Sequence, residues 1–166
     1  MDYRWACSCC GTTFDTLPMD YAYRAPEAWL ALSEAERDTR AKIDSDVCII
    51  DRREFYVRGC IEVPVPERDD TFAWGVWVSV SKDSFCHIVD KWTAEIPADD
   101  PPIPSQLCNQ IGGYPGSNGL RCSVRLQSNG LRPLIVLEPT DHPLAVEQRD
   151  GITLDRVKQI FAESGH

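Results

Sequence analysis

The chain has 166 residues, of which 43% are apolar and 26% charged, which fits a folded domain with a hydrophobic core and excludes disorder over the whole length. Its formal net charge is -9 and it has no run of Lys and Arg, which argues against nucleic-acid binding. No apolar stretch approaches the roughly 20 residues of a transmembrane helix, and the N-terminus lacks the layout of a signal peptide. We therefore expect a cytoplasmic protein without membrane contact, built as a single domain over residues 1–166.

The N-terminal quarter of the sequence predicts a small hairpin followed by two helices. Residues 4–14 are expected to form a strand, a tight turn and a second strand, with Gly11 free to take the positive φ that a knuckle turn needs. A short helix is predicted over residues 26–32, with proline at its first position. A second helix is predicted over residues 33–43, because it opens with the Ser-x-x-Glu pattern of a capping box.

The middle of the chain reads as a β-rich region. Strands are predicted over residues 47–50, 54–63 and 72–80 from their alternating apolar side chains. In the third of these strands Trp77 falls on the face opposite the other large side chains, so both faces are expected to be partly covered. A serine then caps a helix predicted over residues 81–92.

The C-terminal part begins with a long irregular stretch, residues 93–119, which is rich in proline and glycine and is expected to be functional or mobile. Strands are predicted over residues 120–127 and 134–138, and a helix is predicted after Pro143 and another over residues 153–163. Together these elements predict an α+β fold: a mostly antiparallel sheet with flanking helices and an N-terminal zinc-knuckle-like turn.

The best-defined motif is the Cys-Ser-Cys-Cys-Gly segment at residues 7–11. Cys7 and Cys10 have the two-residue spacing that lets two thiolates bind one zinc ion, whereas Cys9 lies between them and is expected to point away. One such pair is only half a site, so a metal-free turn is the alternative. A redox role is the other alternative, but it would require a helix directly after the motif, and Gly-Thr-Thr follows instead.

The remaining zinc ligands must come from distant parts of the chain. Cys48 is our choice for the third ligand because it lies in a predicted strand, and His142 is our choice for the fourth. Asp46 or a water molecule are alternatives to His142. Four protein ligands would make the zinc ion structural, whereas a bound water would leave the open position that catalysis needs.

Residues 138–148 contain a second polar cluster with an acid–base character. Asp141 precedes His142, and a carboxylate can orient an imidazole for proton transfer, with Glu147 close enough to assist. The alternative is a structural histidine that caps the turn before the next helix. Because no nucleophile-elbow motif accompanies the cluster, we assign no catalytic residue.

Several segments together resemble a bacterial family known as domain of unknown function 2199. The resemblance spans nearly the whole chain and implies a small one-domain bacterial protein, without implying an activity or any catalytic residue. It also implies that the knuckle, the Asp-Val-Cys segment and the Asp-His-Pro segment occur together, which fits a shared site. The segments that carry it are Cys7 to Gly11, Asp46 to Ile50, Tyr56 to Gly59, Phe72 to Ser79, Leu137 to Gln148, and Gly151 with Ile152.

The leading functional hypothesis is a zinc-stabilised module that binds another protein or a small ligand. In this hypothesis the zinc ion is structural and ties Cys7 and Cys10 to the strand that carries Cys48. The alternative is a zinc-assisted hydrolase in which His142 binds the metal or acts as a base, assisted by Asp141 or Glu147. Neither hypothesis involves nucleic acid or a membrane.

Overall fold

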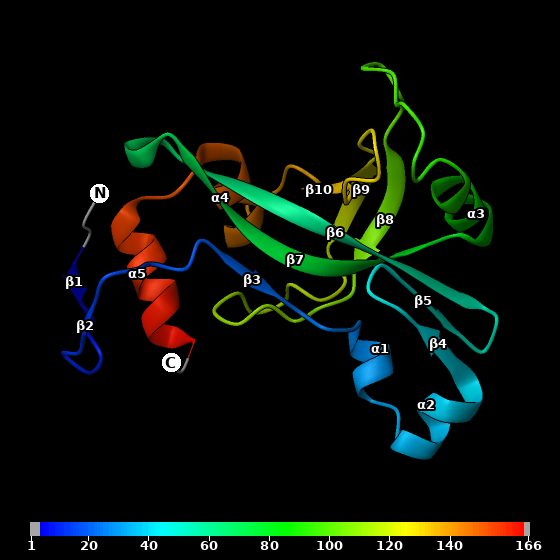
Figure 1. Ribbon diagram of the computed structural model, residues 1–166, viewed down its shortest axis with the longest axis horizontal. Helices are drawn as coiled ribbons and strands as arrows, with labels where there is room; N and C mark the ends of the chain where they lie inside the picture. The colour runs from blue at the N-terminus through cyan, green and yellow to red at the C-terminus, as the bar shows by residue number, and fades with distance from the viewer. Residues whose placement is uncertain (1–3, 165–166) are drawn as a thin grey trace.

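The computed structural model describes residues 4–164, so both ends of the expected domain, residues 1–3 and 165–166, lie outside the described part (Figure 1). The strands are β1 (Trp5–Ala6), β2 (Thr13–Phe14), β3 (Asp20–Ala22), β4 (Ala41–Ile43), β5 (Val47–Ile50), β6 (Glu54–Val65), β7 (Asp70–Val80), β8 (Ile103–Leu107), β9 (Arg121–Arg125) and β10 (Leu134–Leu137). The helices are α1 (Glu27–Leu30), α2 (Glu34–Arg40), α3 (Lys82–Asp90), α4 (Pro143–Asp150) and α5 (Leu154–Glu163), with a short 3-10 helix at Pro66–Arg68.

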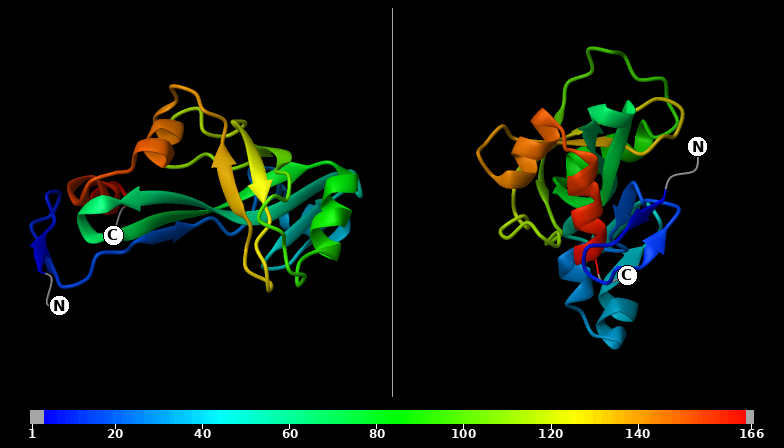
Figure 2. Two further views of the ribbon diagram at one scale, coloured as in Figure 1. Left: turned by 90° about the horizontal axis from the view of Figure 1, so that it is seen from above. Right: turned by 90° about the vertical axis from the view of Figure 1, so that its left-hand side faces the viewer.

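The main sheet closes on itself, which the sequence did not predict. Its strand order is β3-β7-β8-β9-β10-β6-β5-β4, and β6 also pairs with β7, so five strands form a closed barrel and three strands extend it (Figures 1 and 2). The α+β class and the mostly antiparallel pairing are confirmed, but the sequence analysis did not include the closure of five strands into a barrel. Closure depends on a parallel pairing of β10 with β6, at Leu134 and Cys60, and strand patterns alone do not reveal pairings.

The long hairpin of β6 and β7 forms the centre of the molecule. Its register runs from Phe55 opposite Val80 to Val65 opposite Asp70. The strand therefore continues through Pro64, where the sequence predicted its end. The Pro64 carbonyl points away from β7 and accepts the Ile152 N–H (2.8 Å). In a strand the N–H and the carbonyl of one residue point to the same side, so an N–H at this position would also point away from β7. The pairing with β7 therefore loses no hydrogen bond at Pro64.

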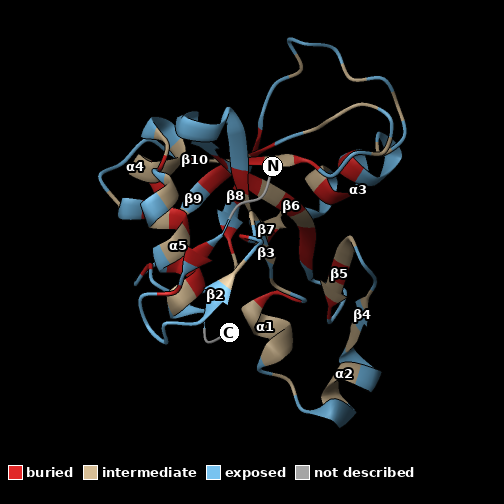
Figure 3. Cartoon of the chain, turned by 60° about the vertical axis from the view of Figure 1, so that its left-hand side comes forward, coloured by how far each residue is buried: buried red, intermediate tan, exposed pale blue. Residues whose placement is uncertain are grey.

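Two hydrophobic cores lie on opposite faces of this hairpin, as the alternation in β7 predicted. Figure 3 shows buried residues, in red, along the ribbon of β6. Phe72, Trp74, Val76 and Val78 belong to the larger core. Trp77 is fully buried in the smaller core, and its indole N–H donates to the Tyr23 carbonyl (2.9 Å). Partly buried residues of α1 and β4 cover the smaller core, and β5 contributes the buried Cys48 and Ile50 to it.

The stretch 93–119 contains a strand that the sequence analysis missed. The sequence pattern did not indicate β8, because Pro101 and Pro102 precede this strand and Pro104 lies within it. The part after β8 is also held in place by buried polar groups. Asn109 accepts the Trp77 backbone N–H (2.8 Å) and donates to the Ala25 carbonyl (2.9 Å), and the Ser117 hydroxyl accepts the Ile111 N–H (2.7 Å).

The helix starts agree with the sequence signals. Ser33 forms the predicted capping box with Glu36, and Ser81 and Thr153 each accept a backbone N–H from the first turn of their helices. The second helix ends at Arg40 rather than residue 43, because residues 41–43 pair with β5. Among residues 4–164, no helix is long and apolar enough to cross a membrane.

Candidate functional site

The N-terminal hairpin forms a knuckle turn around the cysteine motif. Trp5 pairs with Phe14, and the Cys7 N–H donates to the Thr12 carbonyl (2.9 Å) across the turn. The Gly11 N–H donates a hydrogen bond to the Cys7 carbonyl (2.8 Å). Gly11 has a φ of +72°, the positive φ that was expected here because glycine has no side chain.

Three cysteine sulfurs converge in this turn. One sulfur each from Cys7, Cys9 and Cys10 lies within 4.8 Å of the other two, and the Cys7 and Cys9 sulfurs are 2.9 Å apart. Cys7 is buried, whereas Cys9 and Cys10 are exposed. The prediction that Cys9 points away is wrong, because the turn brings its sulfur beside that of Cys7. The geometry therefore offers three soft ligands for one metal ion.

The thiols in the turn differ in acidity. Burial works against ionisation of Cys7, but hydrogen bonds from the Cys9 thiol and from the backbone at Cys9 and Cys10 outweigh it and lower the pKa of Cys7 below its ordinary value. The same contact, in which the Cys9 thiol donates to Cys7, raises the pKa of Cys9 to about 11. Of these two thiols, Cys7 is thus the one that ionises first.

The knuckle is seated on the last helix by an aromatic cluster. Trp5 and Phe14 both contact Phe161 of α5 edge to face, with ring centroids 5.0 Å and 4.9 Å apart. The Trp5 indole N–H also donates to the Thr16 carbonyl (3.0 Å). In Figure 1 this hairpin and α5 lie at one end of the molecule, whereas α1, α2 and β4 lie toward the other.

Cys48 lies in the smaller core and not at the knuckle. It is fully buried in β5, opposite Ile43 on one side and Tyr56 on the other. Burial first, and then the charges of nearby Asp44 and Glu54, raise its pKa to about 12. Among the described residues, the group of possible metal ligands contains neither Cys48 nor His142. Asp46 binds Arg132 instead (2.9 Å).

His142 is the N-cap residue of α4, the alternative role considered from the sequence. Its Nδ1 accepts the Leu144 N–H (3.2 Å), so the proton lies on Nε2, which donates to the Pro115 carbonyl (3.0 Å). Glu147, one turn further along, accepts a hydrogen bond from the Tyr114 hydroxyl and an ion-paired bond from Arg156 (2.9 Å). His142 and Glu147 thus both connect α4 to the loop after β8 through hydrogen bonds. Asp141, next to His142 in the sequence, is exposed.

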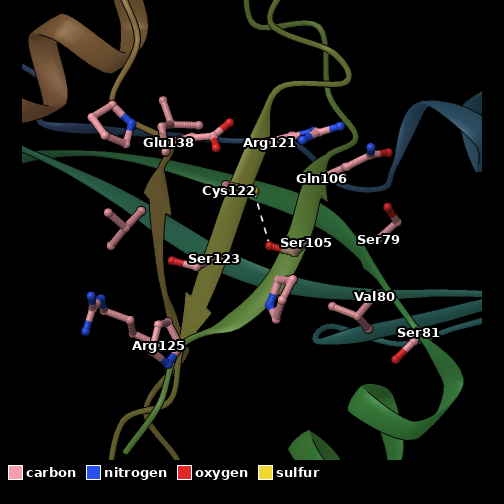
Figure 4. Close-up of a pocket in the computed structure, with 15 residues that line it drawn as sticks. Ser79, Val80, Ser81, Ser105, Gln106, Arg121, Cys122, Ser123, Arg125 and Glu138 are labelled. Carbon is pink, nitrogen blue, oxygen red and sulfur yellow. Dashed lines mark hydrogen bonds between the residues drawn. The ribbon is translucent and has the colours of Figure 1, made fainter. Parts of the chain in front are cut away.

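One large cavity lies on the outer surface of the barrel. It has a volume of about 820 Å³ and crosses β8, β9 and β10, from the junction of β7 and α3 to the end of β10 (Figure 4). We call it the barrel groove; its polar lining includes Ser79, Ser81, Gln106, Arg121, Ser123, Arg125 and Glu138.

A cysteine also borders the barrel groove, but it is not a reactive one. Burial raises the pKa of Cys122 to about 11, and its sulfur lies 3.2 Å from the Ser105 hydroxyl. The residue is therefore a neutral thiol near pH 7.

The sequence offered different amounts of information on these two sites. Cys9 could have been included from the motif itself, because three cysteines within four positions cannot lie far apart. The barrel groove had no signal, because β8 was not recognised and the groove exists only through its pairing with β9.

A comparison with curated proteins and a comparison with solved structures each find no match to this chain. A family model does match residues 6–152, which include the knuckle, the barrel and α4. The resemblance noted from the sequence motifs is thereby confirmed: the chain belongs to the family described as uncharacterized protein conserved in bacteria (DUF2199).

Proposed function

We propose that the protein is a metal-stabilised binding module, in which the N-terminal knuckle holds one zinc ion and the barrel binds a partner or ligand. The observation that carries the metal part is the convergence of the Cys7, Cys9 and Cys10 sulfurs within 4.8 Å of one another. Thiolates are the preferred ligands of structural zinc.

Zinc would require a small change in the turn. In a tetrahedral site with zinc–sulfur bonds of about 2.3 Å, neighbouring sulfurs lie about 3.8 Å apart. The Cys7 and Cys9 sulfurs, now 2.9 Å apart, would separate by about 1 Å. Rotation of the exposed Cys9 side chain can provide this change without moving the buried Cys7.

The proposed ion acts locally, because its three ligands lie within four residues of one chain segment. It would stiffen the knuckle without connecting it to Cys48 or to the barrel. The aromatic contacts of Trp5 and Phe14 with Phe161 would hold the knuckle on α5 instead. Three protein ligands also leave the fourth zinc position to water or to a ligand from outside the turn.

The alternative function, a zinc-assisted hydrolase that uses His142 with Asp141 or Glu147, has less support. Both ring nitrogens of His142 are bonded to backbone groups, and both Glu147 oxygens have partners. A general base must be free to reach its substrate proton. We therefore favour the binding module.

Elemental analysis of protein expressed without a tag tests the metal site. We expect one zinc per chain in the wild type and none in Cys9→Ser or Cys10→Ser, both of which change exposed residues. Cys86→Ser is the matched control, because Cys86 is an exposed cysteine of α3 and should leave the zinc content unchanged. A wild type free of zinc, or equal zinc in all four proteins, would overturn the proposal.

A further inference from the structure

The barrel groove opens where β7 and β8 separate. These strands are paired at only two positions, Val78 with Leu107 and Ser79 with Gln106. Beyond them β7 turns into α3 at Ser81, whereas β8 remains paired with β9 back to Ile103. The divergence leaves one side of β8 open to the groove.

The outer face of β9 provides two positive charges to this groove. Cys122 and Val124 are buried inside the barrel, so Arg121, Ser123 and Arg125 project outward. Figure 4 shows the two arginines at opposite ends of β9 with Ser123 between them. Four residues of strand separate their Cα atoms by about 13 Å.

These two guanidinium groups are not used by the fold. Within residues 4–164, neither Arg121 nor Arg125 forms an ion pair. Other arginines do pair closely: Arg40 lies 2.7 Å from Asp51, and Arg132 lies 2.9 Å from Asp46. In a chain with 26 acidic and 17 basic residues, two arginines in one groove that form no ion pair favour an anion from outside the chain.

Several other lining residues can bind oxygen atoms of a ligand. The hydroxyl groups of Ser79, Ser81 and Ser123 and the amide of Gln106 can donate hydrogen bonds. Glu138 lies beside Arg121, since its N–H donates to the Arg121 carbonyl (3.0 Å), and its carboxylate would repel an anion at that edge. The charge pattern thus directs an anion along β9 and toward β8.

An added peptide strand fits this groove less well. The Cys108 N–H donates to the Trp77 carbonyl of β7 (2.8 Å), so the even-numbered residues of β8 direct their N–H groups toward the open side. The even-numbered residue on the open part of β8 is Pro104, which has no N–H to offer. Recognition must therefore come from side chains.

We propose that the barrel groove is the ligand site of the binding module and that it takes a small organic anion with two acidic groups, one for each arginine. This inference rests on the proposed function, because it names the ligand class for the module. A volume of about 820 Å³ matches an organic molecule and greatly exceeds an inorganic ion. Carboxylates and phosphates offer the same bidentate chemistry to arginine.

Isothermal titration calorimetry at constant ionic strength tests this site. The probes are adipate as a dicarboxylate, fructose 1,6-bisphosphate as a bisphosphate and acetate as a single-charge reference. We expect either adipate or the bisphosphate to bind the wild type, and Arg121→Gln and Arg125→Gln each to raise its Kd by about tenfold or more. Arg53→Gln is the matched control, since Arg53 is an exposed arginine outside the groove, and it should change the Kd less than about twofold.

The outcomes separate the ligand sources and the two proposals. Binding of adipate alone assigns a carboxylate ligand, and binding of the bisphosphate alone assigns a phosphate ligand. The inference is overturned if neither adipate nor the bisphosphate binds the wild type, if acetate binds as tightly, or if the arginine variants bind like the control. Zinc is measured in the same samples, so that zinc-free protein that still binds one of these two ligands contradicts only the metal proposal.

Discussion

Trp5 of the N-terminal hairpin packs edge to face against Phe161 of the last helix, with ring centroids 5.0 Å apart. Phe161 also contacts Phe14, so one side chain near the end of the chain holds both strands of the knuckle. Among the described residues the hairpin has only two paired positions of its own, too few to be stable without this contact.

Replacement of Phe161 by Ala should therefore release the hairpin selectively. We expect amide hydrogen exchange at residues 5–14 to become fast, and the free energy of unfolding to fall by about 3–5 kcal/mol, the usual cost of removing a buried phenylalanine. Zinc content should be retained, because the three sulfurs belong to one turn. Leu131→Ala, at a largely exposed leucine, is the control and should change neither measurement.

Metal removal should have a small and local effect. Because Cys7, Cys9 and Cys10 lie within one turn, a chelator should increase hydrogen exchange in residues 5–14 and leave the strands of the barrel protected. The melting temperature should fall by only a few degrees. Global unfolding after chelation would instead show that the ion connects distant parts of the chain.

The sequence predicted those features that depend on near neighbours. The capping box of Ser33 and Glu36 and the cap at Ser81 each involve residues three positions apart, so their side chains meet whenever the helix forms. The faces of β7 followed in the same way from strict alternation, which assigned Trp77 to its own core. Local periodicity was sufficient for these elements.

Features that depend on strand pairing could not be predicted in this way. The barrel closes because Leu134 meets Cys60, and nothing in either local pattern specifies the other. The proposed grouping of Cys48 with Cys7 had the same weakness, since each residue is buried in a different core. The barrel groove, which depends on three paired strands, had no local signal at all.

His142 provides a direct test of the sequence hypothesis that it binds metal. As an N-cap residue it should contribute about 0.5–2 kcal/mol to the free energy of unfolding, so His142→Ala should lower the urea midpoint. His142→Asn should recover much of this loss, because asparagine is a favourable N-cap residue. We expect both variants to retain the wild-type zinc content, and loss of zinc in both would restore His142 as a ligand.

Alkaline pH should destabilise the smaller core through Cys48. Burial raises the pKa of this thiol from 9.0 to about 12, so the folded state keeps the proton that the unfolded state releases above pH 9. Because the unfolded state then binds fewer protons, the free energy of unfolding falls as pH rises. The contribution is complete below about pH 9 and is lost progressively toward pH 12.

Urea unfolding at pH 8 and at pH 10.5 measures this effect as a difference within each protein. Cys48→Ala should be less stable than the wild type at pH 8, because it leaves a cavity, but should lose less stability between the two pH values. Cys86→Ala, at an exposed cysteine, should show the wild-type loss. Some decrease will remain in Cys48→Ala because burial also raises the pKa of Cys122 to about 11. An identical loss in all three proteins would assign the alkaline sensitivity to other groups and leave Cys48 without a part in it.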